Sequence, residues 1–380
     1  MSLHASPHIP RPQNTTVTCT TTTTTNQIPL LKALGYEVYF AKGLPDGVEP
    51  RRYYPETWNR HDQGLTLPAK DIAFLNSVNF YKTPVWSERL SRVVHKSFDF
   101  VITSAYREVV ENFLTQSTLP VGIRVFGLTG NNSYSDWFDA NTSKLILQNK
   151  SRCYFLAAYD HIVHVEVDFK DMFYFAPITC EPMDSHYAPR LVTDKALLFR
   201  CSDCVLNQTA KATKFLEAFE GSGLDFYVYS TDKSKFNDPR NLGVLTPERM
   251  KRLFSSLSAM FYDSQDPRHL HYSPLEAMWA QMPVVFLEEG MLGSLLPYSP
   301  AKSANVEEAK EILRRLAKGD SGLEREIVWH QNALLQKMRN RNNKQEWSVL
   351  LRDILKKQQP QRRHGAGTER RKREKNLYGA

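Results

Sequence analysis

The segment around residues 273–276 combines residue types and spacing that could do chemistry. Ser273, Pro274 and Glu276 are typical of a helix N-terminus, with Ser273 at the N-cap, Pro274 at the first helical position and Glu276 three residues after the cap, as in a capping box. The N–H groups and partial positive charge of such a terminus can hold a diphosphate, and a nearby carboxylate can accept hydrogen bonds from ribose hydroxyls. The alternative is that Glu276 only caps its helix, and the spacing does not decide between the two.

The elements around this segment alternate regularly between helix and strand. The pattern predicts a helix over residues 247–258 with Thr246 as its N-cap, followed by a strand over 259–262. A polar and basic loop over 264–272 then leads to the helix with the capping-box pattern, and a strand over 284–287 follows it. Such alternation is typical of a doubly wound α/β domain, in which ligands bind at the carboxyl ends of the strands.

The stretch from Asn241 to Gly290 resembles the C-terminal domain of GT-B glycosyltransferases, particularly the large retaining family 4. The resemblance is carried by the runs NLGVLTPERMKRLFSSLSAMFYDS and HYSPLEAMWAQMPVVF, in which a glycine-containing loop, a helix, a strand and a PLEAM-like helix precede a Pro-Val-Val strand. Elsewhere, LLKALGYEVYF and FDFVITS are similar to helix and strand pieces of the N-terminal domain. The resemblance implies an α/β GT-B fold, with two Rossmann-like doubly wound domains facing each other across a cleft.

The resemblance also implies roles in binding a nucleotide-sugar donor. An acid binds the donor ribose, the start of its helix borders the diphosphate, the glycine-containing loop lies beside the base, and a basic residue after the domain's first strand neutralises the leaving diphosphate. The candidate for the acid is Glu276, and Ser273, Pro274 and Leu275 form the start of its helix. Gly243 and Val244 belong to the glycine-containing loop. The candidates for the basic residue are Arg200, Lys211 and Lys214. Lysines on a helix can also be merely solvated.

The chain departs from the family pattern at four places. The family's second glutamate, eight residues before Glu276, is replaced by Arg268, and the histidine that ends the strand over 121–126 is replaced by Phe126. The glycine-rich loop after the first strand is absent, and the glycine before the Pro-Val-Val strand is Gln281. These departures leave the catalytic group unassigned.

Three residues of the polar loop are candidates to contact the transferred sugar. His269 and His271 could donate to sugar hydroxyls or to a carboxylate on the sugar, and Arg268 could serve a charged donor; the alternative is a polar surface loop. The sequence contains no Asp-x-Asp pair, the usual metal–diphosphate clamp of the other main glycosyltransferase fold. We therefore expect no metal site and no cofactor, with the nucleotide sugar as substrate and its diphosphate stabilised by a helix end and basic side chains.

The 380 residues suit two domains of ordinary size. We expect a disordered N-terminus (1–13), an N-terminal Rossmann-like acceptor domain (14–185), a C-terminal Rossmann-like nucleotide-sugar-binding domain (186–325), C-terminal helices (326–357) and a disordered basic tail (358–380). Within the first domain, the stretch from about residue 136 to 183 reads as irregular and aromatic. A β-α-β unit over residues 14–41 opens it.

Composition and charge narrow the protein class. Hydrophobic residues make up 41% and charged residues 24%, as in soluble globular proteins. The chain has no apolar run of the roughly 18 residues that span a bilayer and no signal-peptide pattern, so we expect a cytoplasmic location. Five cysteines, with the single CxxC pair Cys201 and Cys204 lacking a second ligand pair, argue against a disulfide framework or a zinc site.

The net charge of +8 is concentrated at the C-terminal end. Residues 358–380 contain seven basic and two acidic residues, a net +5, which leaves only +3 for the rest of the chain. This tail is either simply solvated or attracted to anionic lipid headgroups or nucleic-acid phosphates. Peripheral association with the inner face of a membrane is therefore one expectation.

The expected function is transfer of a sugar from a nucleotide-sugar donor to a saccharide or glycolipid acceptor, without metal, and with the retention that the resemblance implies. One alternative is a phage-type enzyme that glycosylates modified DNA bases. The net charge of only +3 outside residues 358–380 is a poor match to binding duplex DNA. The other is a non-catalytic GT-B-like binding protein, which the missing glutamate and histidine favour.

Overall fold

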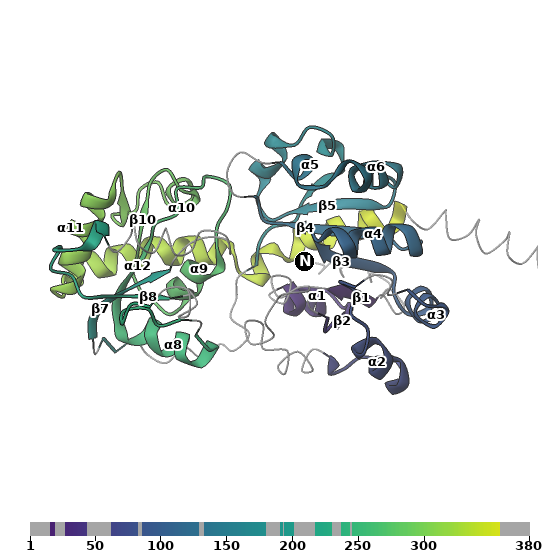
Figure 1. Ribbon diagram of the computed structural model, residues 1–380, viewed down its shortest axis with the longest axis horizontal. Helices are drawn as coiled ribbons and strands as arrows, with labels where there is room; N and C mark the ends of the chain where they lie inside the picture. Colours follow the sequence, from purple (N-terminus) through teal and green to yellow (C-terminus); the bar gives the residue numbers. More distant parts are fainter. Residues whose placement is uncertain are drawn as a thin grey trace, which may run out of the picture. The chain divides into compact units, whose positions relative to one another are not determined.

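The computed structural model has two units, each built on its own parallel β-sheet (Figure 1). The structure describes residues 16–19, 27–43, 62–82, 86–128, 133–179, 191–192, 194–200, 217–229, 237–243 and 245–357. Unit 1 comprises Met1–Val125, Tyr134–Pro177 and Lys344–Ala380, and unit 2 comprises Phe126–Ser133 and Ile178–Asn343. Among the described residues, no helix combines the length and the apolar character that crossing a bilayer requires.

The sheet of unit 1 has six parallel strands in the order β2-β1-β3-β4-β5-β6. Its strands are β1 (Thr16–Cys19), β2 (Glu37–Phe40), β3 (Phe100–Ser104), β4 (Val121–Val125), β5 (Cys153–Ala157) and β6 (Phe173–Phe175). Its helices are α1 (Ile28–Ala33), α2 (Ala69–Asn76), α3 (Glu88–Ser97), α4 (Arg107–Gln116), α5 (Tyr134–Trp137) and α6 (Ala140–Gln148), with 3₁₀ turns η4 (Asp160–Val165) and η5 (Lys170–Met172). The chain passes from β1 outward to β2 and then adds β3 on the other side of β1, which makes a doubly wound sheet with its switch point between β1 and β3.

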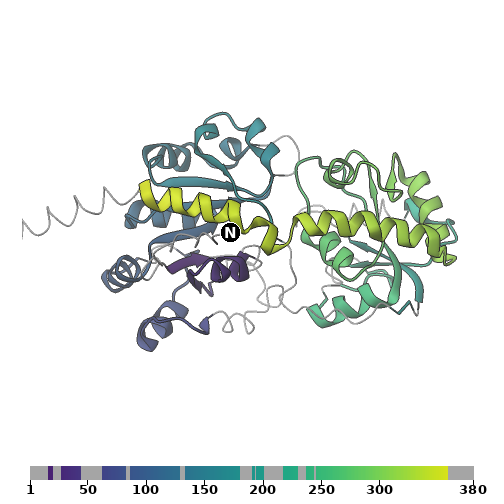
Figure 2. The same cartoon turned by 180° about the vertical axis from the view of Figure 1, so that it is seen from behind.

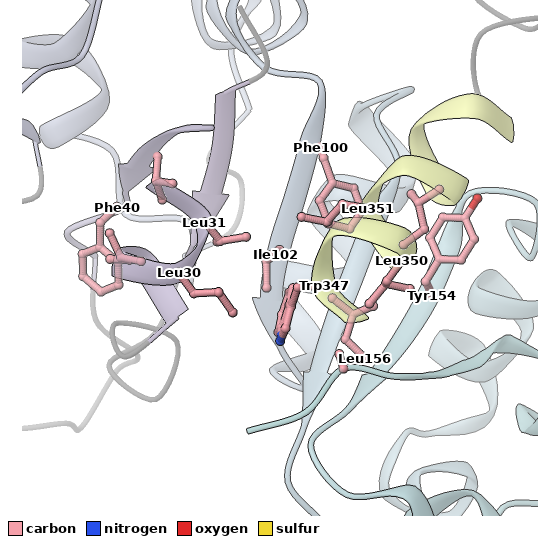
Figure 3. Packing of buried hydrophobic residues seen from close by; sticks show 14 residues of the cluster. Leu30, Leu31, Phe40, Phe100, Ile102, Tyr154, Leu156, Trp347, Leu350 and Leu351 are labelled. Atoms are coloured by element: carbon pink, nitrogen blue, oxygen red, sulfur yellow. The ribbon is translucent and has the colours of Figure 1, made fainter. Parts of the chain in front are cut away.

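The core of unit 1 includes a helix from the far end of the sequence. Residues 340–357 form a helix whose Trp347 and Leu351 are fully buried (Figure 3). Figure 3 shows these side chains beside Ile102 and Phe100 of β3, and Figure 2 shows the helix, in yellow, across one face of the sheet. Burying an apolar side chain of this size stabilises a fold by about 1.5 to 3 kcal/mol. From Lys344 onward, the C-terminal helix is therefore an integral part of unit 1.

A buried arginine lies under that helix. Arg124 of β4 is 1% exposed and donates from one guanidinium nitrogen to the carbonyls of Leu156 (2.9 Å) and Ala176 (2.5 Å). Its guanidinium carbon lies 5.3 Å from the centroid of the Trp347 ring, and the Trp347 indole N–H donates to the Pro177 carbonyl at 3.0 Å. A cation over an aromatic face and an indole with a backbone partner fix how the C-terminal helix packs on the sheet.

Unit 2 repeats the same strand topology. Its five-stranded parallel sheet has the order β11-β10-β9-β7-β8, so the chain passes from β7 outward to β8 and then adds β9 on the other side of β7. The strands are β7 (Asp194–Arg200), β8 (Phe226–Tyr229), β9 (Leu257–Tyr262), β10 (Val284–Leu287) and β11 (Lys302–Ser303). The helices are α8 (Pro247–Ser256), α9 (Tyr272–Trp279), α10 (Met291–Leu295), α11 (Val306–Ala317) and α12 (Ser321–Lys337). The expected pair of doubly wound, Rossmann-like sheets is confirmed.

The structure corrects one local expectation and leaves the predicted domain boundary a prediction. The stretch after residue 136, expected to be irregular, contains the regular elements α6, β5 and β6. That prediction is wrong because its many aromatic side chains pack inward: the rings of Phe155 and Phe173 stack with centroids 4.8 Å apart. The domain boundary that we place near residue 185 stays a prediction, since residues 180–190 lie outside the described part of the chain, as do 1–15 and 358–380.

Gln281 occupies the position at which the family has a glycine, and it adopts the backbone conformation that glycine favours. It directly follows the C-cap of α9 and has φ +60°, a left-handed conformation that costs an ordinary residue about 1 to 2 kcal/mol. Its side-chain amide exchanges two hydrogen bonds with the Asn332 amide, at 3.0 and 3.1 Å. This amide pair offsets the strain.

The amide pair predicts a measurable coupling. Asn332→Ala should lower the free energy of unfolding by about 1 kcal/mol in the wild-type background and by close to nothing in a Gln281→Gly background, because glycine has no amide to pair with. Denaturant unfolding of the four proteins of this cycle measures the difference. Equal costs in both backgrounds would show that the pair contributes nothing to stability.

Candidate functional site

The carboxyl ends of β8, β7 and β9 lie side by side at the switch point of unit 2. Ligands of doubly wound sheets bind outside this edge, where the chain leaves neighbouring strands in opposite directions. The loop over residues 263–271 and the start of α9 follow β9 directly. Beyond β8, Asn241 forms a parallel bridge with Val228, and Gly243 has φ +74° with its N–H bonded to the Asn241 side chain at 3.0 Å. With strands about 4.8 Å apart, β8 and β9 are separated by roughly 10 Å.

Helix α9 begins two residues earlier than the sequence pattern predicts. Its N-cap is His271, with extended φ −72° and ψ 156°, so Ser273 and Pro274 are the second and third helical residues. The predicted capping box is therefore wrong, because Glu276 lies in the fifth helical position and no side chain caps the helix. Proline is tolerated throughout the first turn, where N–H groups have no acceptor within the helix, so Pro274 did not mark the first position.

The new helix start changes which groups can meet an anion. The N–H groups of Tyr272 and Ser273 occupy the first two helical positions, before the intrahelical hydrogen bonds begin, whereas Pro274 has no N–H. The expected donor Leu275 lies one position further on, where an N–H bonds back to the carbonyl of the N-cap, and its side chain is fully buried. Glu276 is exposed on the same helix. The helix N–H groups nearest this edge are therefore those of Tyr272 and Ser273.

The hydroxyl of Tyr262, the last residue of β9, supports the helix start. This fully buried hydroxyl accepts the backbone N–H of His271 at 3.3 Å and lies 2.8 Å from its Nδ1. The tyrosine thereby satisfies the N–H of the N-cap residue, as the glutamate of a capping box would, and it fixes the orientation of the imidazole. Sequence reasoning missed Tyr262, although its place at the end of a strand beside the polar loop was a usable signal.

His269 is oriented by its neighbours in the same way. Its Nδ1 lies 3.1 Å from the carbonyl oxygen of Gly127, and its ring meets the His271 ring edge to face with centroids 4.5 Å apart. A carbonyl oxygen can only accept, so Nδ1 carries the proton and Nε2 is the acceptor in the neutral ring. The two candidate histidines therefore form one cluster at the carboxyl end of β9.

The segment after β4 packs against this loop within unit 2. Gly127 has φ +85°, and a Cβ there would lie 2.0 Å from the carbonyl oxygen of Arg268. The Phe126 ring lies 6.0 Å from the Tyr272 ring, centroid to centroid. The structure thus brings together Phe126 and Arg268, two positions at which the chain departs from the family pattern. Neither the glycine contact nor this meeting was predicted from sequence.

Contacts with the start of α10 hold the other end of the loop. The Arg268 N–H donates to the Asp266 carboxylate at 2.9 Å, and the Met291 N–H donates to the Asp266 carbonyl at 2.9 Å. The Gln265 amide donates to the Glu289 carboxylate at 3.1 Å. Anchored at both ends, the loop presents its histidines in a defined geometry.

For several predicted site residues, the structure does not describe the side chain. Val244, Lys211 and Lys214 lie outside the described residues, and for Arg200 the structure describes only its backbone, as the last residue of β7. The CxxC pair, Cys201 and Cys204, also lies outside them. Within the described chain, no group of three or more His, Cys, Asp or Glu side chains could hold a metal ion. Metal independence stays a prediction.

Comparison with known proteins shows similarity of structure and not of sequence. No protein-family model matches the chain, and no curated protein sequence is significantly similar to it. HepE of Anabaena, in complex with UDP and glucose, superposes with a TM-score of 0.59 and 11% identity over 89% of this chain and 100% of its own. Sucrose-phosphate synthase of Thermosynechococcus elongatus gives a TM-score of 0.59 and 11% identity over 90% and 99%. BGT of phage T4, in complex with UDP and Mn²⁺, gives a TM-score of 0.54 and 11% identity over 90% and 99%.

The chain has the GT-B fold. The similarity extends over nearly the whole length of both proteins in each pair, as a shared two-domain architecture requires. Identities of 11% show a common fold and no closer relationship, so membership of the retaining family 4 stays a prediction.

Proposed function

We propose that the protein is a glycosyltransferase that moves a sugar from a nucleotide-sugar donor to a saccharide or glycolipid acceptor. The observation that supports this most is the set of groups that follows β9 at the switch point of the GT-B unit 2. Two helix N–H groups, two imidazoles and an exposed carboxylate lie within one loop and the first five residues of α9. These groups suit a diphosphate, sugar hydroxyls and a ribose respectively.

The proposal assigns each group a role. The N–H groups of Tyr272 and Ser273 hold the diphosphate and stabilise its charge as it leaves, and Glu276 accepts hydrogen bonds from the ribose hydroxyls. Gly243 borders the base, where a residue without a side chain allows close approach. His269 and His271 contact the transferred sugar, with Arg268 as a further candidate for a charged sugar.

Retention, metal independence and cytoplasmic location belong to the same proposal. Retention is implied by the resemblance to family 4, and metal independence by a diphosphate site made from helix N–H groups and basic side chains. A cytoplasmic enzyme whose basic tail, residues 358–380, meets an anionic membrane would reach a glycolipid acceptor.

Turnover in the presence of a chelator tests this function. The protein incubated with a panel of nucleotide sugars should slowly hydrolyse one of them, and hydrolysis should persist in excess EDTA because no metal bridges the diphosphate. Product analysis by chromatography measures the free sugar and nucleotide. Hydrolysis that EDTA abolishes and Mg²⁺ or Mn²⁺ restores would contradict the metal-free mechanism. Hydrolysis of no nucleotide sugar, with or without metal, would favour a binding protein.

A further inference from the structure

The switch point of unit 1 is bordered by two exposed aromatic side chains. Ala105, Tyr106 and Arg107 follow β3 directly, at the carboxyl edge beside the switch between β1 and β3. Tyr106 is 37% exposed and Trp137, the last residue of α5, is 58% exposed. We call Tyr106 and Trp137 the aromatic pair. Single exposed aromatic side chains are common on protein surfaces, but two that adjoin at the carboxyl edge of a doubly wound sheet provide a stacking surface where ligands bind.

Both rings are held in place although their surfaces are exposed. The Trp137 indole N–H donates to the Ala105 carbonyl at 2.9 Å, which ties α5 to the turn that carries Tyr106. The Tyr106 ring meets the ring of Tyr81 edge to face, with centroids 5.1 Å apart and an angle of 89°. Tyr81 itself is buried. Rings fixed in this way lose little conformational entropy when a ligand stacks on them.

The short helix α5 that carries Trp137 is held by a buried carboxylate. Glu166 is 5% exposed and accepts hydrogen bonds from the N–H groups of Tyr134 (2.7 Å) and Ser135 (3.2 Å) and from the Ser135 hydroxyl (3.1 Å). Burial raises the pKa of the Glu166 carboxyl, although its hydrogen bonds oppose this. A four-residue helix could not hold its shape alone, so Glu166 is what gives Trp137 a defined position.

An ion pair adjoins the aromatic pair. Arg107 follows Tyr106, Asp139 lies two residues after Trp137, and a guanidinium nitrogen of Arg107 donates to the Asp139 carboxylate at 2.9 Å. Both side chains remain about half exposed, at 53% and 45%. The other Asp139 oxygen accepts the Thr142 N–H at 2.9 Å as the N-cap of α6, so this carboxylate is fixed as well. Exposed aromatic surface beside a fixed cation and anion suits a ligand with apolar C–H faces and a rim of hydroxyls.

We propose that the aromatic pair, Arg107 and Asp139 form a saccharide-binding site in unit 1. A pyranose ring places its C–H face on the Trp137 indole with Tyr106 beside it, and its hydroxyls donate to Asp139 and accept from Arg107. The identification of this saccharide as the acceptor rests on the proposed function. The binding site itself does not depend on it.

Saturation-transfer difference NMR with methyl glycopyranosides and disaccharides of glucose, galactose, mannose and N-acetylglucosamine tests the site directly. Wild-type protein should saturate the C–H protons of at least one of these sugars. Trp137→Ala should weaken its binding about tenfold, the scale of an aromatic stacking contact, and Trp137→Phe should weaken it less. The matched control is Trp329→Ala, because Trp329 is also well exposed, at 67%, but lies on α12 of unit 2.

The possible outcomes separate this site from its alternatives. Equal sugar binding by wild-type protein and a folded Trp137→Ala variant, or no binding of any panel sugar by the wild type, would overturn the proposal. Binding to phosphatidylglycerol vesicles that requires Trp137, without any sugar signal, would assign the aromatic pair to a lipid surface instead. Sugar binding that needs Trp137 in a protein without nucleotide-sugar turnover would keep this site and contradict the proposed function. Sugar binding that needs Trp137, together with turnover whose acceptor KM Trp137→Ala leaves unchanged, would keep the site and contradict its identification as the acceptor site.

Discussion

Gly127→Ala should lower the free energy of unfolding by about 2 to 5 kcal/mol and weaken nucleotide binding with it. The left-handed conformation at φ +85° costs an ordinary residue about 1 to 2 kcal/mol. A Cβ at 2.0 Å from the Arg268 carbonyl oxygen also forces the backbone apart, and such overpacking costs about 1 to 3 kcal/mol. Because that carbonyl belongs to the loop with His269, the displacement reaches the candidate site. Denaturant unfolding and nucleotide titration measure the two effects.

Gly35→Ala is the matched control for this variant. Gly35 has nearly the same backbone conformation, φ +91°, but a Cβ there would meet no atom within 4 Å. Its substitution should therefore cost only the conformational part, about 1 to 2 kcal/mol, and should leave nucleotide binding unchanged. Equal losses of stability in the two variants would mean that Gly127 does not pack against the Arg268 carbonyl.

His269→Asn should reduce kcat/KM for sugar transfer by about 2- to 10-fold while the protein keeps its stability to within about 1 kcal/mol. The asparagine amide can replace the Nδ1–H that donates to the Gly127 carbonyl at 3.1 Å, so the loop stays tethered. What it cannot supply is the Nε2 atom, which the proposal places against the sugar. A lost hydrogen bond between a neutral imidazole and a sugar hydroxyl in the transition state costs about 0.5 to 1.5 kcal/mol.

His269→Ala separates the two functions of this side chain. It removes both the tether and Nε2, so stability should fall by about 1 kcal/mol in addition to the loss of activity. Steady-state kinetics and thermal unfolding of both variants provide the comparison. An asparagine variant with wild-type kcat/KM would show that His269 only anchors the loop.

Local sequence patterns predicted the elements around the candidate site well. The Thr246 hydroxyl accepts the Arg249 N–H at 3.3 Å, as an N-cap should, and the strand Val284–Leu287 has the predicted bounds. These features depend on neighbouring residues, which is why periodicity and capping rules find them. The predicted start of α9 was wrong for the same reason: a local pattern allows Pro274 at several positions of the first turn, and the contact of His271 with Tyr262 is not part of that pattern.

Contacts between distant residues could not be predicted in this way. The indole of Trp347 bonds to the Pro177 carbonyl across 170 residues, and His269 meets Gly127 across 142. Neither contact leaves a local signature, so the docking of the C-terminal helix and the environment of the histidine cluster emerge only from the structure. The resemblance predicted the helix–strand–helix–strand order of α8, β9, α9 and β10 correctly, because it compares whole patterns of elements.

Isothermal titration of wild-type protein and Glu276→Gln with a panel of nucleotide sugars tests the donor site at α9. A nucleotide sugar should bind the wild type, and Glu276→Gln should bind it about 1 to 2 kcal/mol more weakly, because hydrogen bonds from ribose hydroxyls to a charged acceptor are stronger than those to a neutral one. Since Glu276 is exposed and lies in the fifth helical position rather than at a cap, the variant should keep its stability to within about 0.5 kcal/mol. Binding of no nucleotide sugar by the wild type, or equal affinity in a folded Glu276→Gln variant, would contradict a donor site at α9.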